Sequence, residues 1–413
     1  MYHKDYSYEA YTTPQQINWG NHIINVCSAV LSVENWSKYY ITIQTDCLNL
    51  RSDLKNDSLD NNRAIKVMCD GRMRQFFPIA LCKYSLSAKK EYAVTAKMLV
   101  KPVLLEDEII EEGDFWEAFI PQISVGSSDS STKVENCHAM DTINFEINGV
   151  NWTIKTPVEQ DGGVLPVEKA KSCGKLTNDI ILLRAPTRFY DYNTFCDVSK
   201  SIAVLLGIAT GTVAHICQYS KRTNLNERIL FKVHNFLYRP MSGWGALRQN
   251  MENNRIKCYL EAAYPIYCTE PIWWNITAHW YTNLTMCGEI DGGNFYMALL
   301  FDRIFHHLKS TEYNRIEQWA IRKNIKMENK KDLNFIHKLE YLANRFKVDI
   351  PANEFKRIRN KLVHEGEPDL NYPHNMQVHE ACLNALTSIL LQMLNYNGDF
   401  HERSYAKAKP IFI

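Results

Sequence analysis

The feature that most constrains the fold of this chain is a change in the spacing of its apolar residues. From residue 22 to about 185 they mostly alternate with polar residues, as in 39–46 and 92–100, which is typical of β-strands that bury one face. From about residue 270 onward they recur every three or four residues, which is typical of amphipathic helices. The sequence therefore predicts an α+β protein with a β-rich N-terminal part and an all-α C-terminal part.

The most specific local signal in the N-terminal part is a β-hairpin. Two alternating runs, 142–147 and 150–156, flank the dipeptide Asn148-Gly149. Both central residues of a two-residue hairpin turn of the favoured type adopt positive φ, which asparagine and glycine tolerate better than other residues. We therefore expect a tight antiparallel hairpin here.

Loops, one helix and a last strand complete the prediction for this part. The polar stretches 106–114 and 124–131 are interpreted as solvated loops. Apolar residues at helical spacing predict a helix over 195–209 that packs on the sheet, with Asp197 as its N-cap. The segment 228–240 predicts one more strand.

Four amphipathic segments predict a helical bundle near the C-terminus. Three of them lie at 293–308, 332–346 and 378–396, and the fourth runs from about 354 to 364. Each has an apolar stripe and a polar back, as helices do when they pack around a shared core. Asp332 is the expected cap of the second segment.

Length and pattern together predict two domains and a tail. A chain of 413 residues exceeds the size at which a single core stops growing. We place a β-rich sensing or regulatory domain at 1–265, the helical bundle at 266–400 and a tail at 401–413.

Composition limits the classes of partner and compartment. The formal net charge is only +1, so a nucleic-acid partner requires a local basic patch, and residues 311–365 supply one with 13 Lys or Arg against 8 Asp or Glu. The most apolar run, 201–217, falls short of a membrane span and is interpreted as buried core, and the N-terminus lacks the apolar run of a signal peptide. The 12 cysteines form no C-x-x-C pair. We therefore predict a cytoplasmic protein with free thiols and no membrane partner.

The fourth helix of the bundle carries the most chemical content. Pro351 and the N-cap candidate Asn353 predict its start, and Gly366 followed by Pro368 predicts its end. Its apolar stripe consists of Phe355, Ile358 and Leu362.

Three polar residues of this helix suggest chemistry. Asn360 and His364 share the outward face, and Arg359 flanks the stripe, where a guanidinium needs an anion or a partner chain. His364 lies in the last turn, whose unpaired carbonyls favour the imidazolium form. A protonated imidazole beside a guanidinium suits proton donation to a leaving oxygen and neutralisation of a phosphate. Because RNA carries its own nucleophile, the 2′-OH, such a site can cut RNA without a metal.

The pattern Arg359-Asn360-x-x-x-His364, in a C-terminal helical bundle, resembles the R-x(4-6)-H signature of the HEPN superfamily. The fuller stretch RIRNKLVHEG, residues 357–366, is similar to the ApeA-like HEPN proteins of bacterial anti-phage defence, in which a long N-terminal domain precedes the HEPN domain. The resemblance covers this short stretch and the order of the two domains.

The resemblance implies an endoribonuclease without a cofactor that acts on RNA loops, such as those of tRNA. Arg359 would hold the scissile phosphate, His364 would act as general acid or base, and Asn360 would orient the pair. The resemblance also implies a homodimer, since HEPN sites are usually composite. A defence role would make the N-terminal domain a sensor of infection, with a phage-encoded trigger, in an abortive-infection system.

The sequence leaves a second assignment of the arginine open. Arg357 lies seven residues before His364, satisfies the longer form of the signature and falls on the same helical face. We prefer Arg359 because of its asparagine neighbour, and we assign Arg357, Lys356 and Lys361 to contacts with RNA phosphates.

Other interpretations of the same residues also remain. From spacing alone, Arg359, Asn360 and His364 fit a helix end finished by a histidine and surface polar residues. The bundle could bind RNA or a nucleotide without cutting it, or only dimerise for an unrecognised N-terminal activity. His306-His307 are interpreted as structural polar residues, because adjacent helical positions point about 100° apart.

Two further groups are left out of the site. Cys137-His138 lacks an evident third group for nucleophilic catalysis. An aromatic cluster beside Ile272 and Ile276 is interpreted as core at a domain junction rather than as a platform for stacking bases. Its members are Trp273, Trp274, Trp280 and Tyr281.

Overall fold

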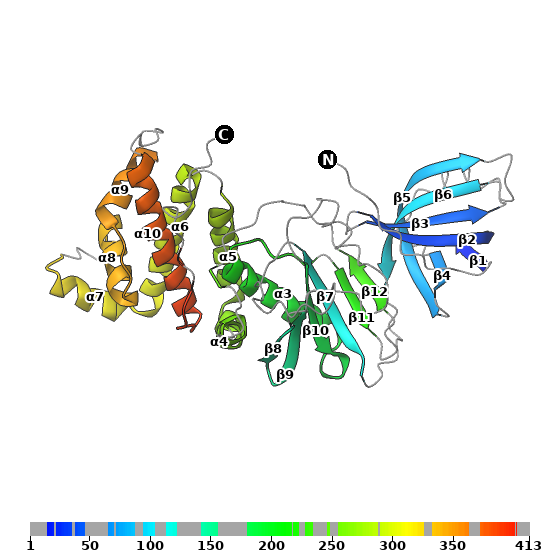
Figure 1. Ribbon diagram of the computed structural model, residues 1–413, viewed down its shortest axis with the longest axis horizontal. Helices are drawn as coiled ribbons and strands as arrows, with labels where there is room; N and C mark the ends of the chain where they lie inside the picture. Colours follow the sequence, from blue (N-terminus) through cyan, green and yellow to red (C-terminus); the bar gives the residue numbers. More distant parts are fainter. Residues whose placement is uncertain are drawn as a thin grey trace, which may run out of the picture. The chain divides into compact units, whose positions relative to one another are not determined.

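Two six-stranded sheets precede a set of helices along the chain (Figure 1). The computed structural model describes residues 15–19, 22–34, 38–45, 65–69, 72–86, 94–103, 113–121, 142–155, 180–216, 218–222, 228–233, 246–247, 255–287, 290–325, 333–362, 372–400 and 402. This order of elements confirms an α+β fold with strands in the N-terminal part and helices in the C-terminal part.

The first sheet is antiparallel, with the strand order β1-β2-β3-β6-β5-β4. Its strands are β1 (Gln15–Trp19), β2 (His22–Glu34), β3 (Lys38–Thr45), β4 (Ile65–Cys69), β5 (Arg72–Leu86) and β6 (Val94–Val103). The predicted strands at 39–46 and 92–100 correspond to β3 and β6, which pair with Ile41 opposite Met98. Both side chains are buried, as the alternating pattern predicts for the packed face.

The second sheet has the strand order β12-β11-β7-β10-β9-β8. Its strands are β7 (Phe115–Pro121), β8 (Thr142–Ile147), β9 (Val150–Lys155), β10 (Ile180–Pro186), β11 (Gln218–Arg222) and β12 (Arg228–Val233). The predicted hairpin is confirmed between β8 and β9, where Asn148 has φ 52° and Gly149 has φ 76°. The strand predicted over 228–240 is found as β12, and residues 234–240 lie outside the described part.

Helix α3 (Tyr192–Thr210) follows the short 3-10 helix η1 (Thr187–Phe189) and packs on this sheet, as predicted. Phe195 of α3 stacks on Trp152 of β9, with ring centroids 5.3 Å apart and an interplanar angle of 5°. The predicted cap Asp197 is wrong, because the helix already begins at Tyr192. The carboxylate of Asp191 caps it instead, by accepting a hydrogen bond of 2.7 Å from the backbone N–H of Thr194.

One residue assigned to a solvated loop is part of the core. Asp114 is only 2% exposed, and its carboxylate lies 2.8 Å from Nζ of the equally buried Lys221 on β11. A buried carboxylate requires such a partner, and the partner is 107 positions away in the sequence, so the polar stretch around Asp114 could not reveal it. Residues 106–112 and 124–131 lie outside the described part.

Seven helices are described in the C-terminal part. They are α4 (Arg255–Thr269), α5 (Pro271–Met286), α6 (Ile290–Thr311), α7 (Tyr313–Arg322), α8 (Phe335–Phe346), α9 (Ala352–Asn360) and α10 (Tyr372–Met393). The four predicted helices of the bundle correspond to α6, α8, α9 and α10, and each of these contacts the other three. Their core is fully buried at Phe301, Leu339, Phe355 and Leu386. Helix α8 is capped by the side chain of Asn334, which accepts from the N–H of His337. The predicted cap Asp332 lies outside the described part.

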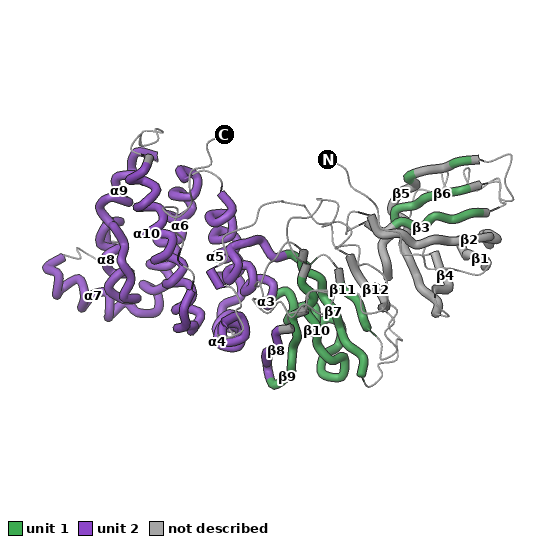
Figure 2. The backbone as a smooth tube through the Cα atoms, viewed as in Figure 1, with its two compact units in different colours: residues 1–121, 149–200, 215–240 green, residues 122–148, 201–214, 241–413 purple. Residues whose placement is uncertain are grey.

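The chain divides into two compact units (Figure 2). The first comprises residues 1–121, 149–200 and 215–240, and the second comprises 122–148, 201–214 and 241–413. Each unit is therefore assembled from separate stretches of sequence. The predicted boundary between 265 and 266 falls inside α4 rather than in a connection.

Side-chain burial agrees with one further prediction from composition. The apolar run at 201–217 supplies buried core residues, among them Ile202, Leu205 and Leu206. The buried Cys196 and Cys382 are free thiols, as are the exposed Cys258 and Cys268. None of the helices in the described ranges combines the length and the apolar character that a membrane crossing requires.

Candidate functional site

Helix α9 begins at Ala352, two residues before the predicted start at about 354. The N–H of Phe355 bonds to the carbonyl of Pro351 at 2.9 Å, which places Pro351 immediately before the helix. Asn353 is therefore exposed inside the first turn and is not the cap. The α-helical hydrogen bonding ends at Asn360, followed by a short π-type turn at 361–362. The predicted end at Gly366 and Pro368 lies outside the described residues.

The buried face of α9 is the predicted one. Phe355 is 0% and Ile358 1% exposed, while Leu362 is half-buried. The ring of Phe355 lies 5.9 Å from that of Phe301 on α6 and 6.1 Å from that of Phe335 on α8, between centroids. These contacts fix the rotation of α9 and thereby decide which of its polar residues face outward.

Arg359 is half-buried and is held by two uncharged groups. Its Nη1 donates to Oδ1 of Asn360 at 3.1 Å, and its guanidinium carbon lies 5.1 Å from the ring centroid of Phe335. It forms no ion pair with a carboxylate in the described part of the chain. The positive charge of Arg359 is therefore positioned without being neutralised by a described residue.

The same helix carries three more cations. Arg357 is exposed, and Lys356 and Lys361 are half-buried. With Arg359 they place four positive charges within six residues, against Glu354 in the first turn. His364, the remaining predicted site residue, lies outside the described residues.

A buried polar pair that the sequence did not suggest links α6 to α10. Nδ1 of His379 lies 2.8 Å from Oδ1 of Asn294, and both residues are buried. Gly293 makes room for the ring, since a Cβ there would lie 2.8 Å from Cε1 of His379. The only signal in the sequence is a glycine inside a helix, which often marks close packing.

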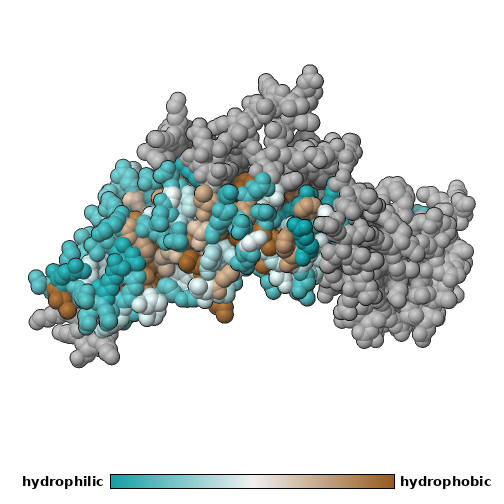
Figure 3. Space-filling view, turned by 90° about the horizontal axis from the view of Figure 1, so that it is seen from below, coloured by the Kyte–Doolittle hydropathy of each residue, from teal (hydrophilic) through white to brown (hydrophobic). Residues whose placement is uncertain are grey.

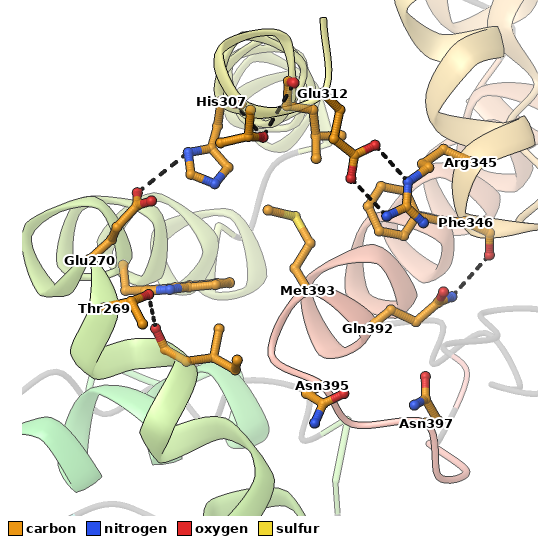
Figure 4. A pocket seen from close by; sticks show the side chains of 14 residues that line it. Thr269, Glu270, His307, Glu312, Arg345, Phe346, Gln392, Met393, Asn395 and Asn397 are labelled. Carbon is orange, nitrogen blue, oxygen red and sulfur yellow. Dashed lines mark hydrogen bonds and ion pairs between the residues drawn. The ribbon is translucent and has the colours of Figure 1, made fainter. Parts of the chain in front are cut away.

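A polar cavity of about 390 Å³ lies at the end of the second unit's bundle where α6, α8 and α10 terminate (Figure 4). Arg345 and Glu312 form a bidentate ion pair on one side, with Nε to Oε2 at 2.9 Å and Nη2 to Oε1 at 2.8 Å. These hydrogen bonds lower the pKa of Glu312 and raise that of Arg345. On the other side Nδ1 of His307 lies 3.5 Å from Oε2 of Glu270. The sequence did not mark this cavity, because its residues come from separate helices.

The two adjacent histidines of α6 face different partners. Nε2 of His306 lies 3.5 Å from Oδ2 of Asp302 and 3.3 Å from Nζ of Lys338. His307 instead faces Glu270, and its ring is tilted by 34° against that of Trp273, with centroids 4.4 Å apart. Across the described ranges, no three metal-ligating side chains gather at one point. Cys137-His138 lies outside these ranges.

The aromatic cluster of α5 is only partly core. Trp274 and Tyr281 are buried and Trp273 and Trp280 are half-buried, whereas the neighbouring Ile272 and Ile276 are 76% and 39% exposed, so the interpretation of the cluster as core holds only in part. Apolar residues occupy more than one face of α5, so its sequence does not define the buried side. Figure 3 shows apolar residues scattered among hydrophilic ones on the described surface it presents.

Two tryptophans of this cluster enclose a cation. The guanidinium carbon of Arg303 lies 5.3 Å from the ring centroid of Trp273 and 5.4 Å from that of Trp280. Its Nε donates to Thr277 at 3.0 Å, and partial burial lowers its pKa. These rings therefore hold α5 to α6 through cation–π contacts.

No family model, curated protein or solved structure matches the chain. The α9 surface and the cavity are the two candidates that the described part offers.

Proposed function

We propose that the chain is a metal-independent endoribonuclease of the HEPN type, which cleaves RNA through attack of a ribose 2′-OH on the neighbouring phosphate. The observation that carries the proposal is the environment of Arg359. Asn360 and Phe335 hold its guanidinium in place, and no described carboxylate neutralises it. A positioned guanidinium without a counter-charge is suited to bind a phosphate through paired N–H donors.

Each predicted site residue has a role in this reaction. The 2′-oxygen forms a bond to phosphorus as the bond to the 5′-oxygen breaks, which leaves a 2′,3′-cyclic phosphate and a 5′-hydroxyl. Arg359 stabilises the charge that develops on the phosphoryl oxygens, and Asn360 keeps it oriented. His364 acts as general acid or base: as a base it accepts the proton of the attacking 2′-OH, and as an acid it gives a proton to the leaving 5′-oxygen.

The remaining cations of α9 bind the flanking RNA. Arg357, Lys356 and Lys361 contact phosphates on either side of the scissile bond, which makes binding strongly dependent on salt. The basic composition of residues 311–365 supports this assignment. The substrate is a structured RNA with an exposed loop, such as tRNA.

The proposal extends to assembly and regulation. Two copies of α9 meet in a homodimer and form a composite site. The N-terminal strands form a sensing part that keeps the cytoplasmic enzyme silent until a phage-encoded trigger appears, since an enzyme that destroys host RNA must be restrained. The size of the strand-rich part, with two six-stranded sheets, is the feature that supports a regulatory role.

The decisive experiment compares wild type with His364→Ala in bacteria, with and without phage, and sequences the RNA ends. Ends that carry a cyclic phosphate should appear with the wild type and disappear with the variant. His279→Ala, at an exposed histidine of α5 outside the basic stretch 311–365, is the matched control and should cleave like the wild type. A wild type that binds RNA but never cleaves it, with Arg359→Ala changing only affinity, would select the binding alternative. Toxicity that survives His364→Ala would favour a dimerisation module.

A further inference from the structure

The cavity at the other end of the bundle is separate from the α9 site. Helix α8 joins the two regions, because Phe335 at its start contacts Arg359 and Phe346 at its end lines the cavity. The twelve residues of α8 span roughly 16 Å at the rise of an α-helix. The volume of about 390 Å³ falls within the range of small-molecule sites.

The charges around the cavity select against an anion. Arg345 is the only arginine or lysine among the described residues of its lining, and the Nε and Nη2 of this guanidinium already bond to Glu312. The carboxylate of Glu270 is 46% exposed and has only the longer contact of 3.5 Å to His307. Because Glu312 and Arg345 neutralise each other, the carboxylate of Glu270 leaves a negative formal charge at the cavity, which a bound ligand would face.

The helix ends add to this negative potential. The last residues of four helices line the cavity, namely Thr269, Thr311, Phe346 and Met393. A helix carries about half an elementary negative charge at its C-terminal end, where the last carbonyls lack partners in the helix. Two helices also begin here, α5 behind Glu270 and α7 behind Glu312, but four negative ends outnumber these two positive ends.

The other residues that line the cavity provide hydrogen-bond acceptors and apolar surface. Asn395 and Asn397 are exposed, and their side-chain amides make no hydrogen bond within the described part of the chain. Figure 4 shows both amides on one side of the cavity, with Met393 between them and His307. Trp274 and Phe346 contribute apolar surface.

From these observations we infer that the cavity binds a small organic cation, with a primary ammonium or guanidinium group at Glu270 and its hydrocarbon chain along Met393 and Phe346. The amide oxygens of Asn395 and Asn397 accept hydrogen bonds from the nitrogen donors of the ligand. The Glu312–Arg345 pair forms a neutral wall. The inference is independent of the nuclease proposal, because no residue of α9 takes part.

The test uses ligands that share a four-carbon chain and differ in charge. Isothermal titration calorimetry of the full-length protein should show binding of putrescine and agmatine, and at least about tenfold weaker binding of neutral 1,4-butanediol and anionic succinate. Glu270→Gln should weaken putrescine binding by about tenfold or more, since it removes a charge-assisted hydrogen bond. Glu340→Gln, at an exposed glutamate of α8 outside the cavity, should leave binding unchanged.

Three outcomes would overturn the inference. They are no binding of either amine at millimolar concentration, tighter binding of succinate than of putrescine, and equal weakening by Glu270→Gln and Glu340→Gln. Arg359→Ala should not change the affinity for putrescine, which separates this site from the proposed RNA site. Circular dichroism of the variants confirms that the half-exposed Glu270 is replaced without loss of structure.

Discussion

Arg345 and Arg359 lie near opposite ends of the same helical bundle, and their guanidinium groups have different kinds of partner. Arg345 forms a bidentate ion pair with Glu312, to which Tyr341 also donates a hydrogen bond. Arg359 meets only the neutral amide of Asn360 and the ring of Phe335 within the described ranges. A guanidinium with a matched carboxylate already has the partner that its geometry favours, whereas one held by neutral groups still offers its charge to a ligand.

The comparison suggests how structural and functional arginines can be told apart. Both belong to the basic stretch 311–365, and both lie on an amphipathic helix next to an apolar residue, Phe346 for Arg345 and Ile358 for Arg359. Only the partners brought by the fold distinguish them. Arg345 is predicted to contribute mainly to stability, and Arg359 mainly to RNA cleavage.

The largest expected effect concerns the platform that holds Arg359. Phe355→Ala removes a fully buried ring between α6 and α8, and should lower the free energy of unfolding by about 3–5 kcal/mol. Thermal and urea unfolding of the full chain would measure this loss. Ile321→Ala, at a side chain that is 66% exposed, should change stability by less than about 0.5 kcal/mol. Equal effects would show that α9 is not packed as described.

The comparison is tested most directly by exchanging the two arginines for alanine. Arg359→Ala should reduce RNA cleavage at least about 100-fold, because a preorganised positive group at the reacting phosphate is lost. Arg345→Ala should change cleavage less than about threefold at a temperature where the variant remains folded, because Arg345 is remote from α9. A tenfold change in rate would require a change of about 1.4 kcal/mol in the activation free energy. Rates on a loop-containing RNA at fixed salt provide the measurement. A larger loss for Arg345→Ala would reverse the assignment of roles.

A smaller effect is expected when the same variants are compared for stability. Arg345→Ala leaves the partly buried Glu312 without its main partner and should cost about 1–2 kcal/mol. Arg359→Ala removes one hydrogen bond to a neutral group and should cost less than about 1 kcal/mol. Calorimetric unfolding of both variants tests this order, and a greater loss for Arg359→Ala would contradict it.

Much of the secondary structure could be predicted because its signals are local. The alternation in 39–46, the Asn148-Gly149 turn and the stripe of Phe355 and Ile358 each lie within a few residues, and the structure bears all of them out. Helix caps were placed less well. Asp191 rather than Asp197 caps α3, because the helix begins one residue after Asp191 and only there can a carboxylate reach a free N–H.

Partners that are distant in sequence could not be predicted. Asp114 pairs with Lys221, Glu312 with Arg345, and Asn294 with His379, and none of these residues carries a local mark of its partner. The same limit applies to the cavity, whose lining is collected from the ends of separate helices. The hydrogen bond between Arg359 and Asn360 was not predicted either, because adjacent helical positions point about 100° apart.

The smallest effect concerns the pH dependence of the Glu312–Arg345 pair. Hydrogen bonds from Arg345 hold the pKa of Glu312 below its ordinary value of 4.5 in the folded state. A carboxyl whose folded pKa is depressed contributes stability that is fully present above the unfolded pKa and is lost as the pH falls through the folded pKa. The difference in unfolding free energy between wild type and Glu312→Gln should therefore stay constant from pH 7 to about pH 5 and shrink below about pH 4.5.

Unfolding midpoints at several pH values measure this difference. Glu317→Gln, at an exposed position of α7, is the control and should differ from the wild type by a constant amount at every pH. A difference for Glu312→Gln that stays constant down to pH 3 would mean that Arg345 does not stabilise the ionised carboxylate. Arg345 would then be as free to meet an anion as Arg359, and the contrast between the two ends of the bundle would fail.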